Sequence, residues 1–326
     1  MPQPLELSVL HDFIAPLVSV IMPTFNPTQS IGRAIESVLD QTFSSWELIV
    51  IDDGSAHELE KLLSSYTIRD ARIRTVRIEE NGGPAVARNI GLTVSRGEWI
   101  ALLDDDDAWL PTRLQRLTTE AQRRTVDMIF DNILGFDDHS KDVTGPIFSA
   151  VPNHITLLDV LESNYRGFHN LGYLKPLIRR EFLVRNSIIY DEKLRVGEDL
   201  LLLLEVLIKR ITNYGIDDAL YVYTTQVGRK SGLQSSTSRS VPSSDSIGEA
   251  VLRFRRLNEG SLTPSEKQAL EERAQLFLQS MPLAEFHHAK LNGKWIDVLR
   301  LLLRHSTVRR YVGSKLGERL RQAQAV

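Results

Sequence analysis

The chain has 326 residues, of which 42% are hydrophobic and 25% charged, and its net charge at pH 7 is −3. This composition is typical of a globular protein with a full core, and the slightly acidic balance excludes a nucleic-acid-binding charge over the chain as a whole. The absence of cysteine excludes disulfides and thiolate metal sites and fits a reducing compartment.

Neither a leader nor a membrane span is expected. Residues 1–15 contain no basic stretch followed by a long apolar core, as a signal peptide would. The longest leucine tract, residues 200–204, closes at Glu205 and is far too short to cross a bilayer. We therefore expect a cytoplasmic protein.

The first 110 residues alternate between apolar runs and segments with helical spacing. The runs are rich in Val, Ile and Leu, which favours buried strands, and the segments between them repeat apolar residues every three or four positions. This alternation predicts an α/β fold, Rossmann-like, with a mostly parallel sheet flanked by helices. The predicted strands are 17–23, 46–51, 73–78 and 99–103, and the predicted helices are 31–41, 58–66 and 85–95.

Beyond residue 110 the pattern is looser. Residues 131–153 are polar and are predicted to be irregular, and 226–245 is rich in Ser, Gly, Arg and Lys, which predicts a flexible loop. From residue 246 the chain is predicted to form a helical extension. The other predictions are helices at 111–124, 156–161, 198–209, 247–257, 264–279, 283–291 and 294–304 and strands at 128–130, 214–216 and 220–223.

Four consecutive acids, Asp104 to Asp107, follow the apolar run 99–103. Like charges at a strand end repel one another unless a cation neutralises some of them. Oxygen ligands on a short loop suit Mg²⁺ or Mn²⁺, which usually keeps water and substrate phosphate in its other positions. The alternative is a solvated acidic turn, but the apolar strand before the acids and Trp109 after them favour a site.

A second acidic pair, Asp52 and Asp53, ends the run 46–51 and is followed by Gly54. Ligands of open α/β sheets bind at the carboxyl ends of strands, so both acidic loops should converge on one cleft. A carboxylate there can accept hydrogen bonds from a ribose hydroxyl or a base N–H, and Gly54 permits close approach. The alternative is an ordinary Asp-Gly turn.

Four motifs together resemble the nucleotide-sugar half of a family 2 glycosyltransferase with the GT-A fold. Their order and spacing between residues 23 and 111 make the resemblance specific. It implies transfer of one sugar from a nucleotide diphosphate donor, usually a UDP-sugar, with inversion at the anomeric carbon and with a divalent cation, Mg²⁺ or Mn²⁺. The motifs are Pro23–Asn26, Asp52–Ser55, Asn81–Gly91 and Leu103–Pro111.

The resemblance also implies roles for individual residues. Asp53 would hold the base, Asp105 the ribose and Asp106 the metal. The family often has a small residue in the middle of its Asp-X-Asp motif, so Asp105 leaves open which acid takes which task. For Arg88 the alternative is a surface helix residue that pairs with a nearby glutamate, at position 79, 80 or 98. The implied donor-binding residues are Thr24, Asn26, Asp52, Asp53, Arg88, Asp104 and Asp105.

Glu198 and Asp199 precede an apolar helix, as the catalytic acid pair does in this family. Direct displacement needs a base that takes the proton from the acceptor hydroxyl. A carboxylate can do this, particularly beside another acid that raises its pKa. We assign the base to Asp199 and a supporting role to Glu198. The alternative is an ordinary helix N-terminus, where acids favour the helix dipole.

By resemblance, residues 16–225 form the catalytic domain, with a nucleotide-sugar half at 16–110 and an acceptor half at 111–225. An N-terminal extension (1–15), the loop (226–245) and a helical region (246–326) complete the predicted division. Residues 165–175 fall where the family builds its acceptor pocket and most resemble exopolysaccharide glucosyltransferases of the succinoglycan type. Basic residues of the loop, Arg229, Lys230 and Arg239, could close over the donor phosphates.

The implied acceptor is a saccharide or a lipid-linked oligosaccharide. The Gln-X-X-Arg-Trp motif of processive members does not occur, so addition of a single sugar is favoured. The C-terminal residues 298–321 alternate Leu and Val with Arg and Lys, and a basic amphipathic helix of this kind can rest on anionic lipid. The alternative is a helical cap with a solvated basic face.

Three other functions would also explain the acidic residues at the strand ends. A nucleotidyltransferase would usually carry a Gly-rich basic loop after the first strand, and none follows residue 23. A receiver-type signalling module gathers acids around Mg²⁺ but is far shorter than this chain. A non-catalytic sugar-nucleotide binder would bind a donor without turnover.

Overall fold

The computed structural model describes residues 16–27, 30–56, 58–163, 170–225, 246–291, 293–306 and 308–313. The elements of its first half are β1 (Val18–Thr24), α1 (Ser30–Leu39), β2 (Trp46–Asp53), α2 (Glu58–Arg69), β3 (Ile73–Ile78), α3 (Pro84–Val94) and β4 (Trp99–Leu102). This half follows the predicted alternation closely, because β1, β2 and β4 are mainly apolar and buried throughout, and β3 combines less exposed Ile and Val with Arg and Thr.

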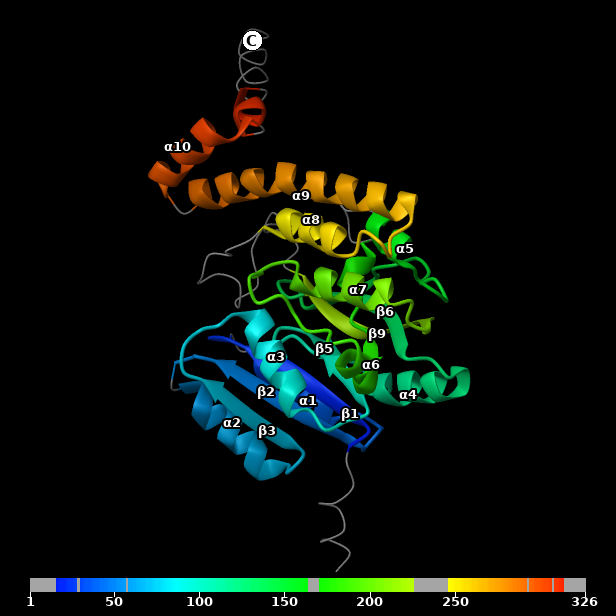
Figure 1. Cartoon of the computed structure of the whole chain (residues 1–326). Helices are drawn as coiled ribbons and strands as arrows, with labels where there is room; N and C mark the ends of the chain where they lie inside the picture. The colour runs from blue at the N-terminus through cyan, green and yellow to red at the C-terminus, as the bar shows by residue number, and fades with distance from the viewer. Residues whose placement is uncertain are drawn as a thin grey trace, which may run out of the picture.

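The second half adds short strands to the same sheet and then turns helical (Figure 1). Its elements are β5 (Ala108–Trp109), α4 (Arg113–Arg124), β6 (Met128–Asp137), β7 (Asp142–Pro146), α5 (Leu157–Glu162), the 3₁₀ turn η2 (Leu171–Tyr173), β8 (Leu177–Arg179), α6 (Arg180–Arg185), α7 (Glu198–Ile208), β9 (Asn213–Thr225), α8 (Ile247–Leu257), α9 (Pro264–Leu291) and α10 (Trp295–Arg304). The predicted starts of α4, α5, α7, α8, α9 and α10 agree with the structure within about two residues, whereas α6 was not predicted.

One sheet contains all these strands, in the order β3-β2-β1-β4-β8-β6-β9-β5, with β7 paired to β6. Strands β1 to β4 are mutually parallel where they pair, as the alternation predicts. Beyond β4 the sheet is mixed, since β8 runs antiparallel to both β4 and β6 while β6 and β9 are parallel. The carboxyl ends of β1, β2 and β4 therefore share one edge, and the acceptor half continues the sheet beside β4.

The prediction that residues 131–153 are irregular is wrong for 131–137 and 142–146, because β6 continues to Asp137 and β7 pairs with it, and it holds for 147–153. Three polar residues of β6, Asp131, Asn132 and Asp137, are buried and bonded within the fold. Asp131 accepts two hydrogen bonds from the fully buried Arg113, at 2.7 and 2.9 Å. Asn132 bonds the backbone of Phe148. A strand whose polar side chains are satisfied internally has the composition of a loop.

Two further boundaries differ from the predictions. The closing strands 214–216 and 220–223 are one strand, β9, which passes a shift of register against β6 near Asp131. The helices 264–279 and 283–291 are one helix, α9, although Pro282 lies inside it. Proline removes one helical hydrogen bond, but α9 packs along α8, α5 and α10, and this packing supports a continuous helix.

The core runs from Val18 to Phe277 as one buried cluster, so α8 and the first part of α9 pack on the same core as the sheet. A second, smaller cluster joins the end of α9 to α10 through Phe286, Ala289, Val298 and Val308. Figure 1 shows α9 and α10 at the end of the molecule opposite α2 and β3. No helix among the described residues is long and apolar enough to cross a membrane.

Candidate active site

Asp53 at the end of β2 fixes the turn that leads into α3. Its two carboxylate oxygens accept the backbone N–H groups of Gly82 and Gly83, each at 2.7 Å. Burial nevertheless raises the pKa of Asp53, although these donors lower it. Asp53, which is predicted to bind the base, is therefore held in one orientation by the backbone of the Asn81–Gly91 motif.

Gly83 is required at this turn for two reasons. Its φ of +92° is strained for any residue with a side chain. A Cβ there would also lie 1.6 Å from Nη1 of Arg195, whose guanidinium covers the turn and lies 3.3 Å from Asn81 Oδ1. Arg195 comes from the segment before α7, so the acceptor half reaches across to the Asp53 turn.

Asp52 and Asn26 hold the neighbouring loops. Asp52 accepts the backbone N–H of Ser55 at 2.9 Å and pairs with Arg77 at 2.6 Å. Asn26, with a φ of 44°, accepts the N–H of Ala56 through its side chain and donates its own N–H to the Ser55 hydroxyl. Both side chains thus bind the protein's own backbone and shape the loops beside Asp53.

Thr24 at the end of β1 donates its hydroxyl to Asp105 Oδ2 at 2.6 Å, and both side chains are buried. Burial, reinforced by the charge of Asp106, raises the pKa of Asp105 to about 7. Burial and the charge of Asp104 raise the pKa of Asp106 to about 6. Burial also raises the pKa of Asp107. Three of the four acids are therefore held where ionisation is costly, which a nearby cation would relieve.

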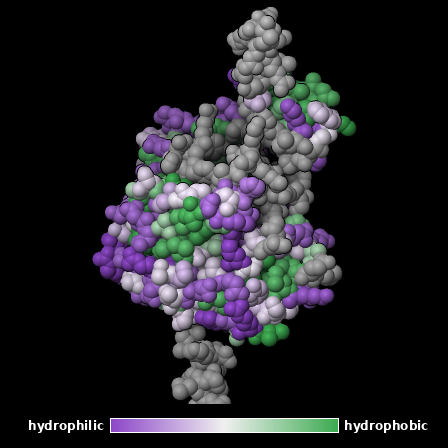
Figure 2. Space-filling view, turned by 180° about the vertical axis from the view of Figure 1, so that it is seen from behind, coloured by the Kyte–Doolittle hydropathy of each residue, from purple (hydrophilic) through white to green (hydrophobic). Residues whose placement is uncertain are grey.

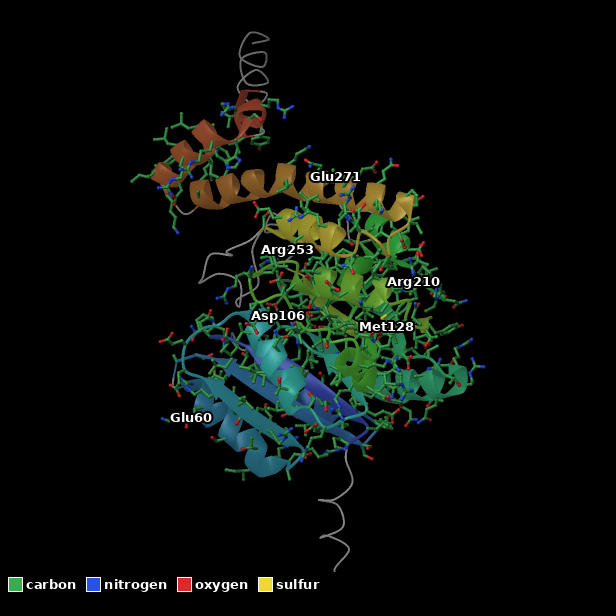
Figure 3. All side chains as sticks on the ribbon, viewed as in Figure 1. Glu60, Asp106, Met128, Arg210, Arg253 and Glu271 are labelled. Atoms are coloured by element: carbon green, nitrogen blue, oxygen red, sulfur yellow. The ribbon has the colours of Figure 1, made fainter. Side chains whose placement is uncertain are left out.

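The loop of the four acids is tied to β9 and to α1. Asp107 accepts the hydroxyl of Tyr221 at 2.7 Å and the backbone N–H of Thr224 at 2.8 Å. The carbonyl of Asp106 accepts both the Thr224 hydroxyl and Nη2 of Arg33, each at 2.5 Å. These bonds fix the backbone of Asp106 and leave its carboxylate, near the middle of the molecule in Figure 3, without an ion pair among the described residues.

Arg88 on α3 joins the acid loop to the start of α7. It is only 4% exposed. It donates to Asp104 at 2.7 Å and to Glu198 at 2.6 Å, and its Nη1 lies 3.5 Å from Asp199 Oδ1. Burial alone would lower the pKa of Arg88, but these three carboxylates raise it. The alternative of a surface residue paired with Glu79, Glu80 or Glu98 is wrong.

Lys175 makes a second bridge between the same parts. It is 6% exposed and donates to Asp104 at 2.8 Å and to Asp199 Oδ2 at 2.5 Å. Burial alone would raise the pKa of Asp104, but Lys175 and Arg88 hold it well below its usual range. Asp104, Glu198 and Asp199 thus share two buried cations that close the edge of the sheet against α7.

The residues fit a divalent cation that is held jointly with substrate phosphates. No group of three or more His, Asp or Glu side chains in the described part of the chain could hold a metal by itself. Mg²⁺ commonly binds through one or two carboxylates plus phosphate oxygens. The carboxylate of Asp106 suits this arrangement, because it is half-buried and forms no ion pair with any described residue. Asp104 is less available because Arg88 and Lys175 already engage it.

The sequence did not predict Arg33 or Arg195 as residues of this site, and it placed Lys175 only at the end of the acceptor segment 165–175, without its ion pairs. Each bonds a partner far away in sequence, such as Asp104 for Lys175, and none stands in a motif. The predicted acceptor residues 165–169 and the loop residues Arg229, Lys230 and Arg239 lie outside the described residues. The remaining predicted residues all lie around the two acidic loops and the start of α7.

The raised pKa of Asp105 predicts a pH-dependent cost to stability. The carboxyl is neutral in the folded protein below about pH 7 but ionises near 3.8 when free, so wild-type stability should fall from pH 4 to pH 7 on account of this group. Asp105→Asn removes that cost. We expect it to stabilise the protein by on the order of 2 kcal/mol at pH 8 and by almost nothing at pH 4.

Urea unfolding of both proteins at pH 4, 6 and 8 checks this expectation. Asp142→Asn, at an exposed acid of β7, serves as the control and should change stability little at any pH. A gain for Asp105→Asn that is equal at all three pH values would show that its charge is not the cause.

Comparisons with known proteins agree with this geometry. The family model "Glycosyl transferase family 2" matches residues 19–181. The succinoglycan biosynthesis protein ExoO of Rhizobium meliloti (strain 1021) is 37% identical over 196 residues, which are 59% of this chain and 56% of ExoO. The Escherichia coli "UDP-Glc:alpha-D-GlcNAc-diphosphoundecaprenol beta-1,3-glucosyltransferase WfgD" is 35% identical over 116 residues, which cover 36% of this chain and 45% of WfgD. The chain thus spans about half the length of these relatives.

Among solved structures, S. aureus TarS 1-349 in complex with UDP-GlcNAc matches with a TM-score of 0.61. The sequence identity is 22%, and the match covers 83% of this chain and 80% of that one. At this identity the likeness shows the fold alone, and it confirms the GT-A fold with a C-terminal helical part that the sequence predicts.

Proposed function

Because this chain belongs to glycosyl transferase family 2, we propose that it transfers one sugar from a nucleotide diphosphate sugar to a hydroxyl of a saccharide or of a lipid-linked oligosaccharide. The observation that carries the proposal is the pair of buried bridges from Asp104 to the Glu198–Asp199 pair. Arg88 and Lys175 bring the acid that belongs to the donor loop and the acids at the start of α7 into one network, as a transfer between two substrates requires.

The donor is proposed to lie over the ends of β1, β2 and β4. Asp53 would bind the base, with Asp52 and Asn26 holding the loops around it and Thr24 orienting Asp105 toward the ribose. We propose a UDP-hexose such as UDP-glucose. The support is indirect: the name of WfgD includes UDP-Glc, and the TarS complex contains UDP-GlcNAc.

We assign the metal, Mg²⁺ or Mn²⁺, to Asp106, beside the donor diphosphate. When bound there it would neutralise the charge that develops on the departing nucleoside diphosphate, so no protein group has to protonate the leaving oxygen. Arg33 and Thr224 hold the backbone of Asp106 and thereby aim its carboxylate.

Asp199 is proposed to be the general base. Its side chain is 22% exposed while Oδ1 is buried, so the accessible oxygen is Oδ2. This oxygen accepts one hydrogen bond from Lys175 and has a second lone pair for the proton of the acceptor hydroxyl. The hydroxyl oxygen then forms its bond to the anomeric carbon as the bond from that carbon to the diphosphate breaks, with inversion.

We propose a role in cell-surface polysaccharide synthesis, which the relatives' names support, and we propose that the protein acts at the cytoplasmic face of the membrane. A lipid-linked acceptor such as the one in the WfgD name would be presented there. We propose that this chain adds a single sugar to such an acceptor.

A panel of UDP-, GDP- and dTDP-sugars, scored by calorimetry with and without Mn²⁺, tests the donor assignment. We expect binding of a UDP-sugar to strengthen at least ~10-fold with Mn²⁺, because the ion shares the donor phosphates with Asp106. Asp106→Asn should remove most of that gain and leave the binding without metal nearly unchanged. Metal-independent binding, or no binding of any donor, would contradict the proposal.

A further inference from the structure

Helix α10 has an apolar face that is exposed in the part of the chain that the structure describes. Trp295, Ile296, Leu299 and Leu303 are between 60% and 78% exposed, and we call them the α10 apolar face. Positions 295, 299 and 303 succeed one another at four-residue spacing and 296 lies beside them, so the four side chains share one side of the helix. Figure 2 shows a hydrophobic patch over this end of the molecule.

The opposite, inner side of α10 is already used. Val298 is buried in the small cluster with Phe286 and Ala289 of α9, and Leu301 and Leu302 pack against the same cluster. The apolar arc of α10 is therefore much wider than the surface that α9 covers. Four large exposed apolar side chains on one helix, including a tryptophan, mark a contact surface.

The charges beside this face indicate what covers it. Residues 290–313 contain six Lys and Arg and a single acid, Asp297, whereas the whole chain has a net charge of −3. Arg300 and Arg304 follow the apolar face around the helix and are exposed, and Lys294 precedes it. A helix with Trp and Leu on one side and Arg and Lys at its border has the pattern of one that lies in the surface of an anionic bilayer.

A second copy of the chain fits this face less well. In a symmetric dimer the same patch meets itself. Arg300 and Arg304 would then approach their own counterparts, with Asp297 alone among residues 290–313 to neutralise them, and Asp297 already pairs with Arg300 at 3.1 Å. Charge complementarity thus favours anionic lipid over self-association.

We propose that the α10 apolar face docks the protein on an anionic membrane surface, with Trp295, Ile296, Leu299 and Leu303 entering the interface and Arg300 and Arg304 contacting lipid headgroups. The surface lies on α10 at one end of the molecule, whereas Asp106 lies near its middle (Figures 1 and 3). The inference does not depend on the proposed donor or base. If the acceptor is lipid-linked, docking would hold the enzyme where its acceptor is concentrated.

Co-sedimentation of the full chain with vesicles tests the proposal, using phosphatidylcholine alone and phosphatidylcholine with about one third phosphatidylglycerol. We expect binding to the anionic vesicles only, and weaker binding as salt screens the arginines. The double variant Ile296→Glu/Leu303→Glu should lower vesicle affinity at least ~10-fold. Arg300→Gln should lower it about 5-fold and leave the apolar contacts in place.

The matched control is Ile68→Glu/Leu257→Glu, which adds the same two charges at apolar positions on α2 and α8 that are 86% and 77% exposed. It should bind vesicles as the wild type does, and both double variants should retain donor binding by calorimetry. Equal binding to both vesicle types, or equal loss in both double variants, would overturn the proposal. So would a change from dimer to monomer in Ile296→Glu/Leu303→Glu without any vesicle binding by the wild type, which would assign the face to a second copy.

Discussion

Asp199→Asn is expected to reduce sugar transfer at least ~100-fold and to leave donor binding nearly intact. The amide has the shape of the carboxylate but cannot accept the proton of the acceptor hydroxyl. It can still accept a hydrogen bond from Lys175 through its oxygen, so the bridge between Asp104 and the start of α7 is largely kept. Donor affinity should change less than ~3-fold, because the donor is assigned to loops on the other side of that bridge.

Transfer assays and donor calorimetry on the same preparations separate these two effects. Glu205→Gln is the matched control, since Glu205 lies on the same helix, is partly buried and has its pKa raised by that burial, yet faces away from the acid loops toward Asp191 and Lys209. It should retain wild-type transfer. Full transfer by Asp199→Asn would remove Asp199 as the base, and a parallel loss of donor binding would make its role structural.

The wild-type protein also distinguishes the alternatives that the sequence leaves open. A non-catalytic binder would bind a donor and show no transfer to any acceptor, with Asp199→Asn indistinguishable from the wild type. A nucleotidyltransferase would release diphosphate from a nucleoside triphosphate. The proposed transferase releases a nucleoside diphosphate, so the nucleotide product identifies the reaction.

The first half of the fold was predictable because its strands and helices are signalled locally. Strands β1, β2 and β4 are mainly apolar runs that end at polar turns, and β3 combines apolar and polar residues. The helices between them repeat apolar residues at regular spacing. Strand direction followed as well, since a helix between two strands makes them parallel. Short strands without a helical crossover, such as β8, carry no such signal, and the mixed half of the sheet could not be deduced.

Buried polar residues explain the largest error. Asp131 and Asn132 make β6 look like a loop, and only their partners, Arg113 and the backbone of Phe148, show why a strand tolerates them. The role of Lys175 could not be predicted for the same reason, because its partners, Asp104 and Asp199, are far from it in sequence. Acids at strand ends can be read from sequence, whereas the cations that neutralise them depend on contacts across the sheet.

Arg88→Met is expected to destabilise the protein by about 3–5 kcal/mol at pH 8, because it removes one cation from a buried network and leaves its acids unpaired. Methionine nearly fills the volume but provides no donor for Glu198 or Asp104. Lys175 alone would then face three carboxylates. Urea unfolding at pH 8 and pH 5 measures the loss.

Exposure of the ion pair decides the size of this effect, and Arg69→Met is the control that shows it. Arg69 pairs with Glu36 at 2.5 Å, as closely as Arg88 pairs with its partners, but its side chain is 55% exposed, so its loss should change stability far less than the loss of Arg88. The cost of Arg88→Met should also shrink at pH 5, since unpaired buried carboxyls take up protons more readily than paired ones. Equal, small losses of stability for both variants would mean that Arg88 does not hold the donor loop to α7. The proposed network of Asp104, Glu198 and Asp199, which carries the proposed function, would then have to be abandoned.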